Sequence, residues 1–389
     1  MKTLPLRKSG PLVEPFRWPI VSDQDPPRAL KTLGQIIDND LCHRCGSCVG
    51  ICPTNVLGLD DEEFPVVENL GACTDCDLCV KVCPGDEFDA VGVARQLFHT
   101  TPDIRDMHGH FEHAYLSYAT DPEIRQRSTS GGLVTGLLVS LLQRGEIDGA
   151  VVIASDPVDL WKGIPVIART EEEIRKATKA KYAIAPTNRV FREIREVAGR
   201  YALVGLPCQI HGFHKAARLD KRLRERVAVT IGLFCHAAVE HEPMRYIWNH
   251  IGEPRHRATA FISRFGKHSG TPHIEFEDGS TRPVYFPEKK GFRPSSMEII
   301  NVLYRLYTPP RCLTCYDSTS EFADIAVGDP WMPTPSDDIS FYDGYTFVFA
   351  RTHRGDETLS RAKEAGDIDL IELRDSTARR ANTAMGIEK

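Results

Sequence analysis

The residues best suited to redox chemistry are eight cysteines in two runs of identical spacing. The first run is Cys42, Cys45, Cys48 and Cys52 before Pro53, and the second is Cys73, Cys76, Cys79 and Cys83 before Pro84. Both read C-x2-C-x2-C-x3-C-P, the spacing of bacterial two-cluster ferredoxins, in which the fourth cysteine of each run binds the cluster of the other run. We therefore predict two [4Fe-4S] clusters, one held by Cys42, Cys45, Cys48 and Cys83 and the other by Cys73, Cys76, Cys79 and Cys52.

The spacing itself explains this chemistry. Three thiolates on one tight loop reach three corners of a cubane cluster, the fourth arrives from elsewhere, and the proline ends the loop because it has no amide donor. Structural zinc is the alternative, but zinc takes four ligands and does not need a triplet plus one repeated twice. Between the runs, the apolar pairs Val56-Leu57 and Val66-Val67 fit short strands of a pseudo-symmetric ferredoxin fold.

Four further cysteines lie in the second half of the chain: Cys208 in G-L-P-C-Q, Cys235 in G-L-F-C-H, and Cys312 with Cys315 in C-L-T-C. Cys208 and Cys235 each end a hydrophobic stretch that we predict as a strand. Strand ends on one edge of a sheet converge, so two such cysteines and one C-x2-C loop are able to supply four thiolates to a third cluster. Buried free cysteines and a zinc site are the alternatives.

A different signature, S-T-S-G-G-L-V-T-G-L-L from Ser128, indicates anion binding. A glycine pair that opens an apolar helix favours a phosphate, because the helix dipole and free amides attract an anion and glycine admits a close approach to the backbone. This predicts a phosphate site at Ser130, Gly131 and Gly132. Ser128 and Ser130 also suit plain helix caps, and capping without a ligand is the alternative.

Composition limits the classes of protein that these sites belong to. A chain of 389 residues with 41% hydrophobic and 26% charged residues suits a globular protein of two or three domains. The net charge of -6 offers no basic surface, so we expect no nucleic-acid partner. We expect neither a secretory signal in the proline-rich start nor a membrane span in the apolar stretch 133–142, which predicts a cytoplasmic protein.

Apolar patterns after residue 128 predict an α/β body. Strands are expected at 150–154, 165–169, 202–205 and 227–234, and helices at 171–179 and 190–197. After about residue 259 the pattern turns toward β, with strands at 260–263, 273–276, 281–285 and 345–350, so the later part is typical of an α+β arrangement.

Two polar segments contain residues of ligand-binding type. The first contains four histidines without a fixed ligand spacing, for which we predict surface or capping roles: His99, His108, His110 and His113. The second is the basic stretch with Lys289, Lys290 and Arg293. It fits either a solvated turn at 287–291 or a site for an anionic substrate.

Six motifs taken together resemble one family. They are S-G-G-L-V-T-G-L-L from Ser130, K-A-K-Y-A-I-A-P from Lys179, G-L-P-C-Q-I from Gly205, G-L-F-C from Gly232, C-L-T-C-Y-D from Cys312 and A-D-I-A-V-G-D from Ala323. In this order they resemble the beta subunit of coenzyme F420-reducing hydrogenase and its relatives, which include formate dehydrogenase beta subunits and 7-hydroxymethyl chlorophyll a reductase. The resemblance covers roughly residues 114–371, while the appended ferredoxin module is not a fixed feature of such relatives.

The resemblance implies FAD and a third [4Fe-4S] cluster held by Cys208, Cys235, Cys312 and Cys315. FAD is then expected against the helix start at Ser130, Gly131 and Gly132 and against the loop from Lys179 to Tyr182. From the same motifs we expect the following residues at the cofactor or in catalysis: Thr135, Gly205 and Pro207 as cofactor contacts, Lys181 as a charge near the flavin, and Asp329 as a carboxylate lining the cavity. A turn cap is the alternative for Asp329.

This interpretation divides the chain into five parts. We predict an extension at 1–30, a ferredoxin domain with two clusters at 31–93, a connector at 94–114, an FAD-binding part at 115–200, and a part at 201–389 with the third cluster and the C-terminal tail.

Three functional hypotheses follow, because a cluster transfers one electron whereas hydride-type reduction transfers two, and a flavin interconverts them. The first is an FAD and iron–sulfur oxidoreductase that reduces or oxidises a small organic molecule, an anionic one if the basic stretch binds it, with ferredoxin or a redox subunit as its electron partner. The second is a beta subunit that exchanges electrons between coenzyme F420 and a hydrogenase or dehydrogenase. The third is a ferredoxin-type adaptor without flavin. The sequence leaves substrate, electron direction and assembly open, including a homo-oligomer or a complex subunit.

Overall fold

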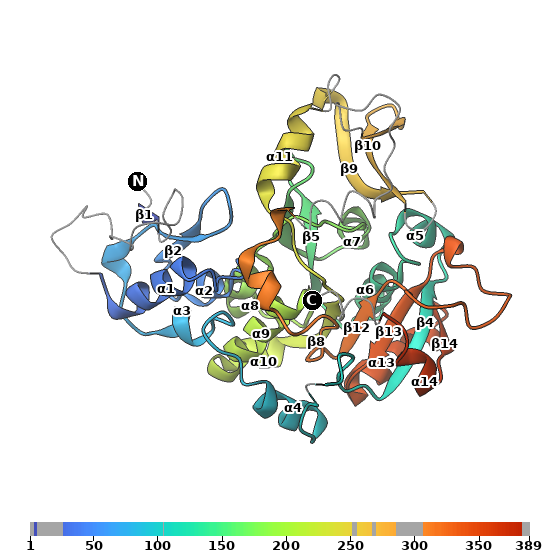
Figure 1. The fold of residues 1–389 in the computed structure, drawn as a ribbon, viewed down its shortest axis with the longest axis horizontal. Helices are drawn as coiled ribbons and strands as arrows, with labels where there is room; N and C mark the ends of the chain where they lie inside the picture. The colour runs from blue at the N-terminus through green and yellow to red at the C-terminus, as the bar shows by residue number, and fades with distance from the viewer. Residues whose placement is uncertain are drawn as a thin grey trace.

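The computed structural model describes residues 4–5, 26–103, 105–250, 255–266, 270–284 and 306–382. The basic stretch with Lys289, Lys290 and Arg293 and the turn expected at 287–291 lie outside the described residues, as does most of the expected extension 1–30. The described part contains a small cysteine-rich module, a large mixed sheet with its helices, and a separate three-stranded sheet (Figure 1).

The cysteine-rich module lies at one end of the molecule (Figure 1). It consists of α1 (Arg28–Asp38), α2 (Ser47–Ile51), α3 (Leu78–Lys81) and a sheet of β1 (Leu4–Pro5), β3 (Pro65–Val67) and β2 (Leu57–Leu59) in that order. α2 carries Cys48 and α3 carries Cys79, the third cysteine of each run. Each helix follows a left-handed residue, Gly46 with φ 82° and Asp77 with φ 60°, so the sequence repeat is also a backbone repeat.

An eight-stranded mixed sheet forms the centre of the remaining chain, in the order β14-β4-β13-β12-β8-β7-β5-β6. Its strands in chain order are β4 (His113–Ala119), β5 (Gly149–Ser155), β6 (Gly163–Ala168), β7 (Tyr201–Gly205), β8 (Val227–Leu233), β12 (Ile325–Gly328), β13 (Thr346–Ala350) and β14 (Ile368–Glu372). Neighbouring strands are parallel from β12 through β8 and β7 to β5, and antiparallel elsewhere. The predicted mixed α/β fold is confirmed, and one sheet joins strands from both expected parts, 115–200 and 201–389.

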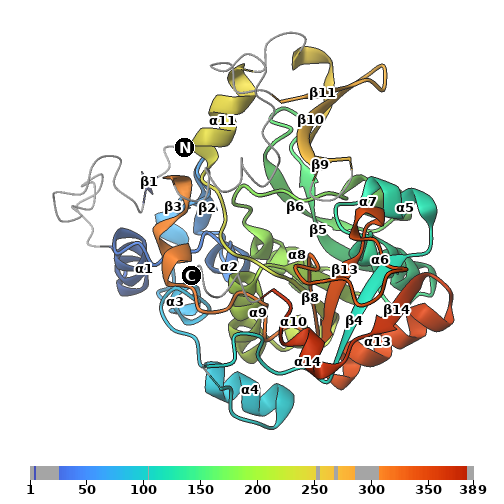
Figure 2. The same cartoon turned by 45° about the vertical axis from the view of Figure 1, so that its right-hand side comes forward.

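Helices cover both faces of this sheet (Figure 2). Ala150 and Val152 of β5 pack into the core on one face, and Val151 packs into the core on the other, as the pleat of a strand requires. The first core includes residues of α6 (Leu133–Gln143), α7 (Glu171–Lys176) and α13 (His353–Glu364), and the second those of α4 (Ala90–Phe98), α8 (Phe191–Glu196), α9 (Pro207–Leu219) and α10 (Lys221–Arg226). Ile51 and Val82 of the cysteine-rich module also belong to the second core, so module and sheet share one interior.

The short helices α5 (Pro122–Arg127) and α14 (Asp375–Ala378) complete the body. α5 starts at Asp121, whose carboxylate accepts hydrogen bonds from the amides of Glu123 and Ile124. No helix within the described ranges is long and apolar enough to cross a membrane.

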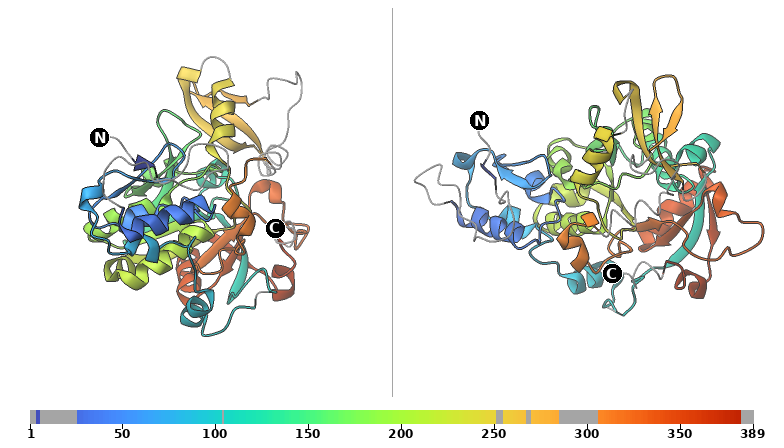
Figure 3. Two further views of the ribbon diagram at one scale, coloured as in Figure 1. Left: turned by 60° about the vertical axis from the view of Figure 1, so that its left-hand side comes forward. Right: turned by 45° about the horizontal axis from the view of Figure 1, so that its top comes forward.

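The third sheet projects from the body beside α11 (His241–His250) (Figure 3). It is antiparallel, with β9 (Ala258–Phe265), β10 (Thr271–Phe276) and β11 (Thr281–Pro283) in the order β11-β10-β9. Trp248 of α11 packs edge-on against Phe261 of β9, with 6.4 Å between ring centroids. The sheet is therefore held to α11 by a small hydrophobic core, which also contains Trp161 and Ala183 of the body.

The four histidines of the expected connector differ in their surroundings. His99 ends α4 in the left-handed region, with φ 55°, and His113 is exposed on β4. The predicted surface or capping role is wrong for His108, whose residue is 3% exposed and whose Nε2 atom lies 2.7 Å from the carbonyl oxygen of Ala381. The polar composition of the segment suggested exposure, but the carbonyl oxygen of Ala381, near the other end of the described chain, is a buried hydrogen-bond partner for this ring.

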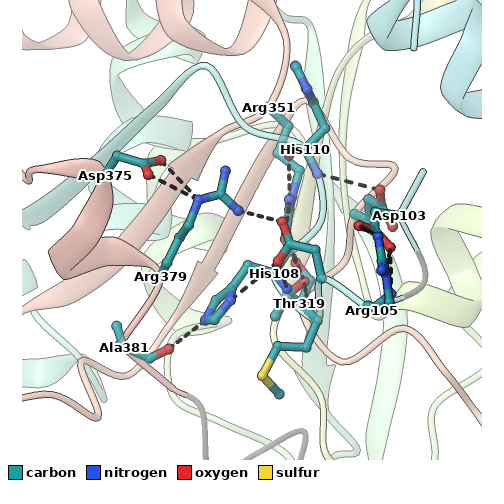
Figure 4. A network of polar contacts seen from close by, with 12 residues as sticks. Asp103, Arg105, His108, His110, Thr319, Arg351, Asp375, Arg379 and Ala381 are labelled. Atoms are coloured by element: carbon teal, nitrogen blue, oxygen red, sulfur yellow. Dashed lines mark hydrogen bonds and ion pairs between the residues drawn. The ribbon is translucent and has the colours of Figure 1, made fainter. Parts of the chain in front are cut away.

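A buried arginine fastens the same segment to the body (Figure 4). Arg351 follows β13, is 0% exposed, and donates hydrogen bonds to the carbonyl oxygens of His108, His110 and Thr319. Burial lowers the pKa of Arg351 to about 10. Since Thr319 lies four residues after Cys315, the network ties the connector to the loop that carries this cysteine.

Candidate iron–sulfur and cofactor site

One set of four thiols lines a pocket within the cysteine-rich module: Cys52, Cys73, Cys76 and Cys79. Burial and then the thiol of Cys52 raise the pKa of Cys79 to about 12. Cys52 belongs to the first run and the other three to the second, which is the grouping that crossed ligation requires. Cys76 is exposed, so this set reaches the protein surface.

A second set lies deeper and consists of Cys42, Cys45, Cys48 and Cys83. Burial, and then the thiols of Cys42, Cys83 and Cys45, raise the pKa of Cys48 well above its usual value. Thiols in such a place ionise when a cationic metal centre binds them, because the metal deprotonates its ligands. Each set of four therefore has the donor atoms and the grouping of a [4Fe-4S] site.

A second pocket contains the third set of thiols, Cys208, Cys235, Cys312 and Cys315, together with Cys42, His43 and Pro207. Cys208 lies in the first turn of α9 directly after β7, and Cys235 follows β8, the parallel neighbour of β7. Cys312 and Cys315 lie in and just after the 3-10 turn Pro310–Thr314. Carboxyl ends of adjacent strands thus bring Cys208 and Cys235 to one edge of the sheet, where the turn adds Cys312 and Cys315. Four thiolates fit a [4Fe-4S] cluster.

Two further observations bear on metal binding, the first on the third set and the second on all the described residues. Burial, and then the thiols of Cys45, Cys235, Cys315 and Cys312, raise the pKa of Cys208 well above its usual value. Within the described ranges, no three His, Cys, Asp or Glu side chains are placed to hold a single metal ion.

The second and third sets adjoin at a closely packed junction. Cys42 lines the pocket of the third set, and the Cys45 thiol helps to raise the pKa of Cys208. The amide of Asn188 donates to the carbonyl oxygen of Cys45 at 2.9 Å, and the Asn188 side chain donates to the Ser47 hydroxyl at 2.9 Å. A Cβ atom on Gly46 would lie 2.7 Å from the Pro186 carbonyl oxygen, so the ligand loop and the segment around Asn188 meet without spare room.

Ion pairs and charged hydrogen bonds reinforce this junction. The Arg44 guanidinium lies 2.6 Å from the Glu240 carboxylate, with the Arg44 side chain 2% exposed. Lys162 pairs with Glu63 at 2.7 Å, and the Lys215 ammonium donates to the carbonyl oxygen of Cys83 at 2.7 Å. The cysteine-rich module is therefore docked on the body through buried polar contacts as well as through the shared core.

The residues expected at FAD fall into two places, and the larger group lies around Ser130. The Ser130 hydroxyl donates to Asp329, and the guanidinium of Arg264 lies 2.7 Å from the second carboxylate oxygen of Asp329. The Tyr182 hydroxyl is hydrogen-bonded to Arg264. The amide of Ala180 donates to Thr129 Oγ1 at 3.0 Å, so the loop from Lys179 to Tyr182 joins the same place.

Arg264 is the residue of this group that the sequence did not reveal. It lies on β9 of the projecting sheet, 65 residues before Asp329. Its side chain is 7% exposed. Burial acts to lower the pKa of Arg264, but Asp329 and Tyr182 together outweigh burial, so the pKa is raised. The only signal in the sequence was an arginine within an apolar strand, and its role became clear only with its partner Asp329.

The glycine pair does not stand open toward a ligand. Gly131 and Gly132 have φ of 70° and 76°, so both occupy the left-handed region that glycine favours. A Cβ atom on Gly131 would lie 2.9 Å from the carbonyl oxygen of Gly344, and the next helical turn, with Thr135, is buried. The expected close approach at Gly131 is made by the protein's own backbone.

The two lysines of the loop differ in their surroundings. The Lys181 ammonium donates to the carbonyl oxygens of Ala177, Thr178 and Lys179 at 3.0–3.3 Å, where it caps the end of α7. Burial, and then Lys179, lower the pKa of Lys181 to about 8. Lys179 itself has φ 77°, and its ammonium lies 5.7 Å from the ring centroid of Phe265.

Gly205 and Pro207 form the smaller group, beside the third thiol set. Gly205 ends β7, and Pro207 opens α9 and lines the pocket with Cys208 and Cys235. The structure therefore places these two predicted cofactor contacts at the thiols, and Ser130, Lys179, Tyr182 and Asp329 together in the other place.

Comparison with known proteins assigns the family. The N-terminal model of coenzyme F420 hydrogenase/dehydrogenase beta subunits matches residues 114–192 and the C-terminal model matches residues 198–376. The chain belongs to the coenzyme F420 hydrogenase/dehydrogenase beta-subunit family. A 4Fe-4S dicluster domain matches residues 35–84, so this family member is an iron–sulfur, F420-related oxidoreductase subunit with a role in electron transfer.

Relatives of this family member resemble it over most of its length. The coenzyme F420-dependent sulfite reductase of Methanocaldococcus jannaschii is 27% identical over 88% of this chain, which spans about half (49%) of that protein. A subunit of the F(420)H(2) dehydrogenase of Methanosarcina mazei is 26% identical over 86% of each chain. A chain in the xenon-derivatised F420-reducing [NiFe] hydrogenase complex from Methanosarcina barkeri superposes with a TM-score of 0.55 and 25% identity, over 72% of this chain and 89% of that chain.

Proposed function

We propose that this chain relays electrons between a protein partner and coenzyme F420 through three [4Fe-4S] clusters and one FAD. The observation that carries the proposal is the junction of the deeper and third thiol sets, where Cys42 lines one pocket with Cys208, Cys235, Cys312 and Cys315. Cys42 and Cys48 of the deeper set also share a hydrophobic core with Cys52, Cys73 and Cys79. The exposed set with Cys76, the deeper set with Cys45 and the set at the sheet edge with Cys208 therefore form one continuous series. F420 appears in the names of all three relatives described above.

The group around Ser130 suits the anionic diphosphate of FAD. Lys179 and Lys181 bring positive charge to this place, whereas the charge of Arg264 is already offset by Asp329. The hydroxyl oxygen of Ser128 is buried and has no hydrogen-bond partner within the described residues. A phosphate oxygen bound there would satisfy Ser128 and offset the lysine charges. When bound, FAD supplies the conversion between one-electron and two-electron transfer.

The protein groups of this place have separate tasks in the proposal. Lys179 and Ser128 hold the diphosphate, and Lys181 fixes the end of α7 beneath the loop. Asp329 shapes the site and does not transfer a proton, because Ser130 and Arg264 already engage its two oxygens. Arg264 thereby holds the projecting sheet against the carboxyl end of β12 in the large sheet.

The protein partner meets the chain at the exposed thiol set. Cys76 is exposed, whereas Cys45, Cys48 and Cys83 are buried, so the set containing Cys76 is the accessible end of the series. A hydrogenase or dehydrogenase subunit or a ferredoxin fits this role. The series serves either direction of electron flow.

An anaerobic reduction experiment tests the proposal. Chemically reduced coenzyme F420 is mixed with the fully loaded chain, and FAD and cluster reduction are followed by absorbance and electron paramagnetic resonance. We expect both to be reduced in the wild type, and FAD alone in Cys208→Ser. Protein loaded with clusters but without FAD would identify an adaptor. A flavin that ignores reduced F420 would identify a reductase of another small molecule.

A further inference from the structure

His43 occupies the boundary between two thiol sets. It follows Cys42 of the deeper set, and it lines the pocket formed by Cys208, Cys235, Cys312 and Cys315. Its Nδ1 atom is buried and has no hydrogen-bond partner within the described residues. An unsatisfied buried polar atom costs about 1–3 kcal/mol, so an imidazole kept there needs a partner in the assembled protein.

The backbone around His43 is fixed on both sides. Arg44 has φ 53°, and its side chain turns to Glu240 at 2.6 Å and to the carbonyl oxygen of Glu62 at 3.1 Å. The Arg44 amide donates to the Cys42 sulfur at 3.4 Å, and the Cys45 carbonyl oxygen is bound by Asn188. These contacts fix the backbone of the ligand loop on both sides of His43, so the fold sets the position of the His43 side chain.

Cysteine sulfur is the most abundant side-chain acceptor in the lining of this pocket. Four cysteines of the third set line it, and of the deeper set Cys42 alone lines it among the described residues. Two side-chain oxygen acceptors of the lining are already engaged: the Asp317 carboxylate by His211 and the amide of Glu321, and Gln209 Oε1 by the amide of Leu206. Arg311 carries donors and no acceptor. A buried ring nitrogen without a protein partner among the described residues, on a residue that lines a pocket with five cysteines, therefore fits the role of a donor to sulfur.

We propose that His43 is a positioning residue for the third cluster, whose sulfur accepts a hydrogen bond from its Nδ1–H. The proposal rests on the third cluster of the proposed function. Hydrogen bonds to cluster sulfurs tune the reduction potential, because they stabilise the reduced and more negative state. His43 thus makes the third cluster easier to reduce and favours electron residence on the body side of the junction.

Anaerobic redox titration followed by electron paramagnetic resonance tests this role in His43→Leu and His43→Gln. Leucine removes the donor, and we expect the reduction equilibrium of the third cluster to fall about tenfold, which is about 59 mV for one electron. Glutamine keeps an N–H donor and should restore part of the shift. The potential of the cluster held by Cys52, Cys73, Cys76 and Cys79 should stay unchanged, as should all potentials in His113→Gln, a matched change at an exposed histidine.

Each other outcome has a distinct meaning. An unchanged potential of the third cluster in His43→Leu overturns the proposal, and so does loss of iron in both His43 variants, which would make His43 a ligand. Equal shifts of all clusters would show a general structural effect and also overturn it. Wild-type protein that lacks the third cluster would refute the proposed function itself, and iron analysis before the titration separates that failure from the others.

Discussion

Replacing Glu240 with glutamine should loosen the cysteine-rich module from the body. The Arg44 side chain is 2% exposed and its guanidinium lies 2.6 Å from Glu240, so the change removes the charge partner of a buried cation. Hydrogen bonds to charged groups contribute about 1.5–3 kcal/mol. Because the Glu240 side chain is 27% exposed, water compensates part of the loss, and we expect about 1.5–2 kcal/mol. This corresponds to roughly a 10- to 30-fold shift of the opening equilibrium.

Amide hydrogen exchange at Asn188 measures this opening. Asn188 is 0% exposed, and its amide donates to the carbonyl oxygen of Cys45 across the junction at 2.9 Å. Exchange of this amide should accelerate roughly 10- to 30-fold in Glu240→Gln. Glu225→Gln is the matched control, because it removes the charge partner of Lys221 in an exposed pair at 3.5 Å. Unchanged exchange at Asn188 would refute the role of Glu240 in docking, and equal acceleration in the central strands would show global destabilisation instead.

The remaining predictions concern iron, Gly131 and Lys181. Anaerobically assembled protein should contain about 12 iron per chain and Cys208→Ser about eight, since three clusters hold four iron each. Wild-type protein with only about eight iron, and with zinc at the third thiol set, would contradict the third cluster. Gly131→Ala should lower the stability of flavin-free protein by about 1–3 kcal/mol, because its Cβ meets Gly344 and alanine disfavours φ 70°; an unchanged melting temperature would contradict this. Lys181 has a pKa lowered from 10.5 to about 8 by burial, so the unfolded chain binds its proton more tightly and flavin-free stability should rise between pH 8 and 10.5. Lys181→Met should lose that rise in thermal melts, and an identical pH profile would refute the shift.

Elements defined by local apolar runs were predictable, and their ends were not. The strand expected at 150–154 is β5, Gly149–Ser155, and the helix expected at 171–179 is α7, which ends at Lys176. The left-handed Lys179, with φ 77°, lies in a turn that helical periodicity does not reveal. β4 was missed, because its buried Ser117 interrupts the apolar pattern and bonds instead to the carbonyl oxygen of Asp369 on β14.

The sequence predicts the grouping of the clustered cysteines, but it does not predict the polar contacts around the sites. Crossed grouping of the eight clustered cysteines follows from spacing along a short loop, so sequence carries it. The functions of Gly131, Arg264 and His108 depend on partners more than 60 residues away, namely Gly344, Asp329 and Ala381. A residue type alone does not identify such a partner, and for this reason the glycine pair was predicted to be open and Arg264 was not predicted at all.

The sequence repeat in the cysteine-rich module does not reveal which of its two thiol sets lies next to the body, although this decides the order of electron transfer. Both runs have the same spacing, so the sequence treats them as equivalent. Their flanking residues are not equivalent in the fold: Gly46 admits the close approach of Pro186, whereas the corresponding position in the second run is Asp77, which pairs with Arg28 of the module itself at 2.5 Å. A side chain at Gly46 would push the first loop away from the body, and Asp77 keeps the second loop within the module. The glycine therefore makes the set with Cys45 the one that adjoins the body and its third set, and the set with Cys76 is left as the end of the series that a partner reaches.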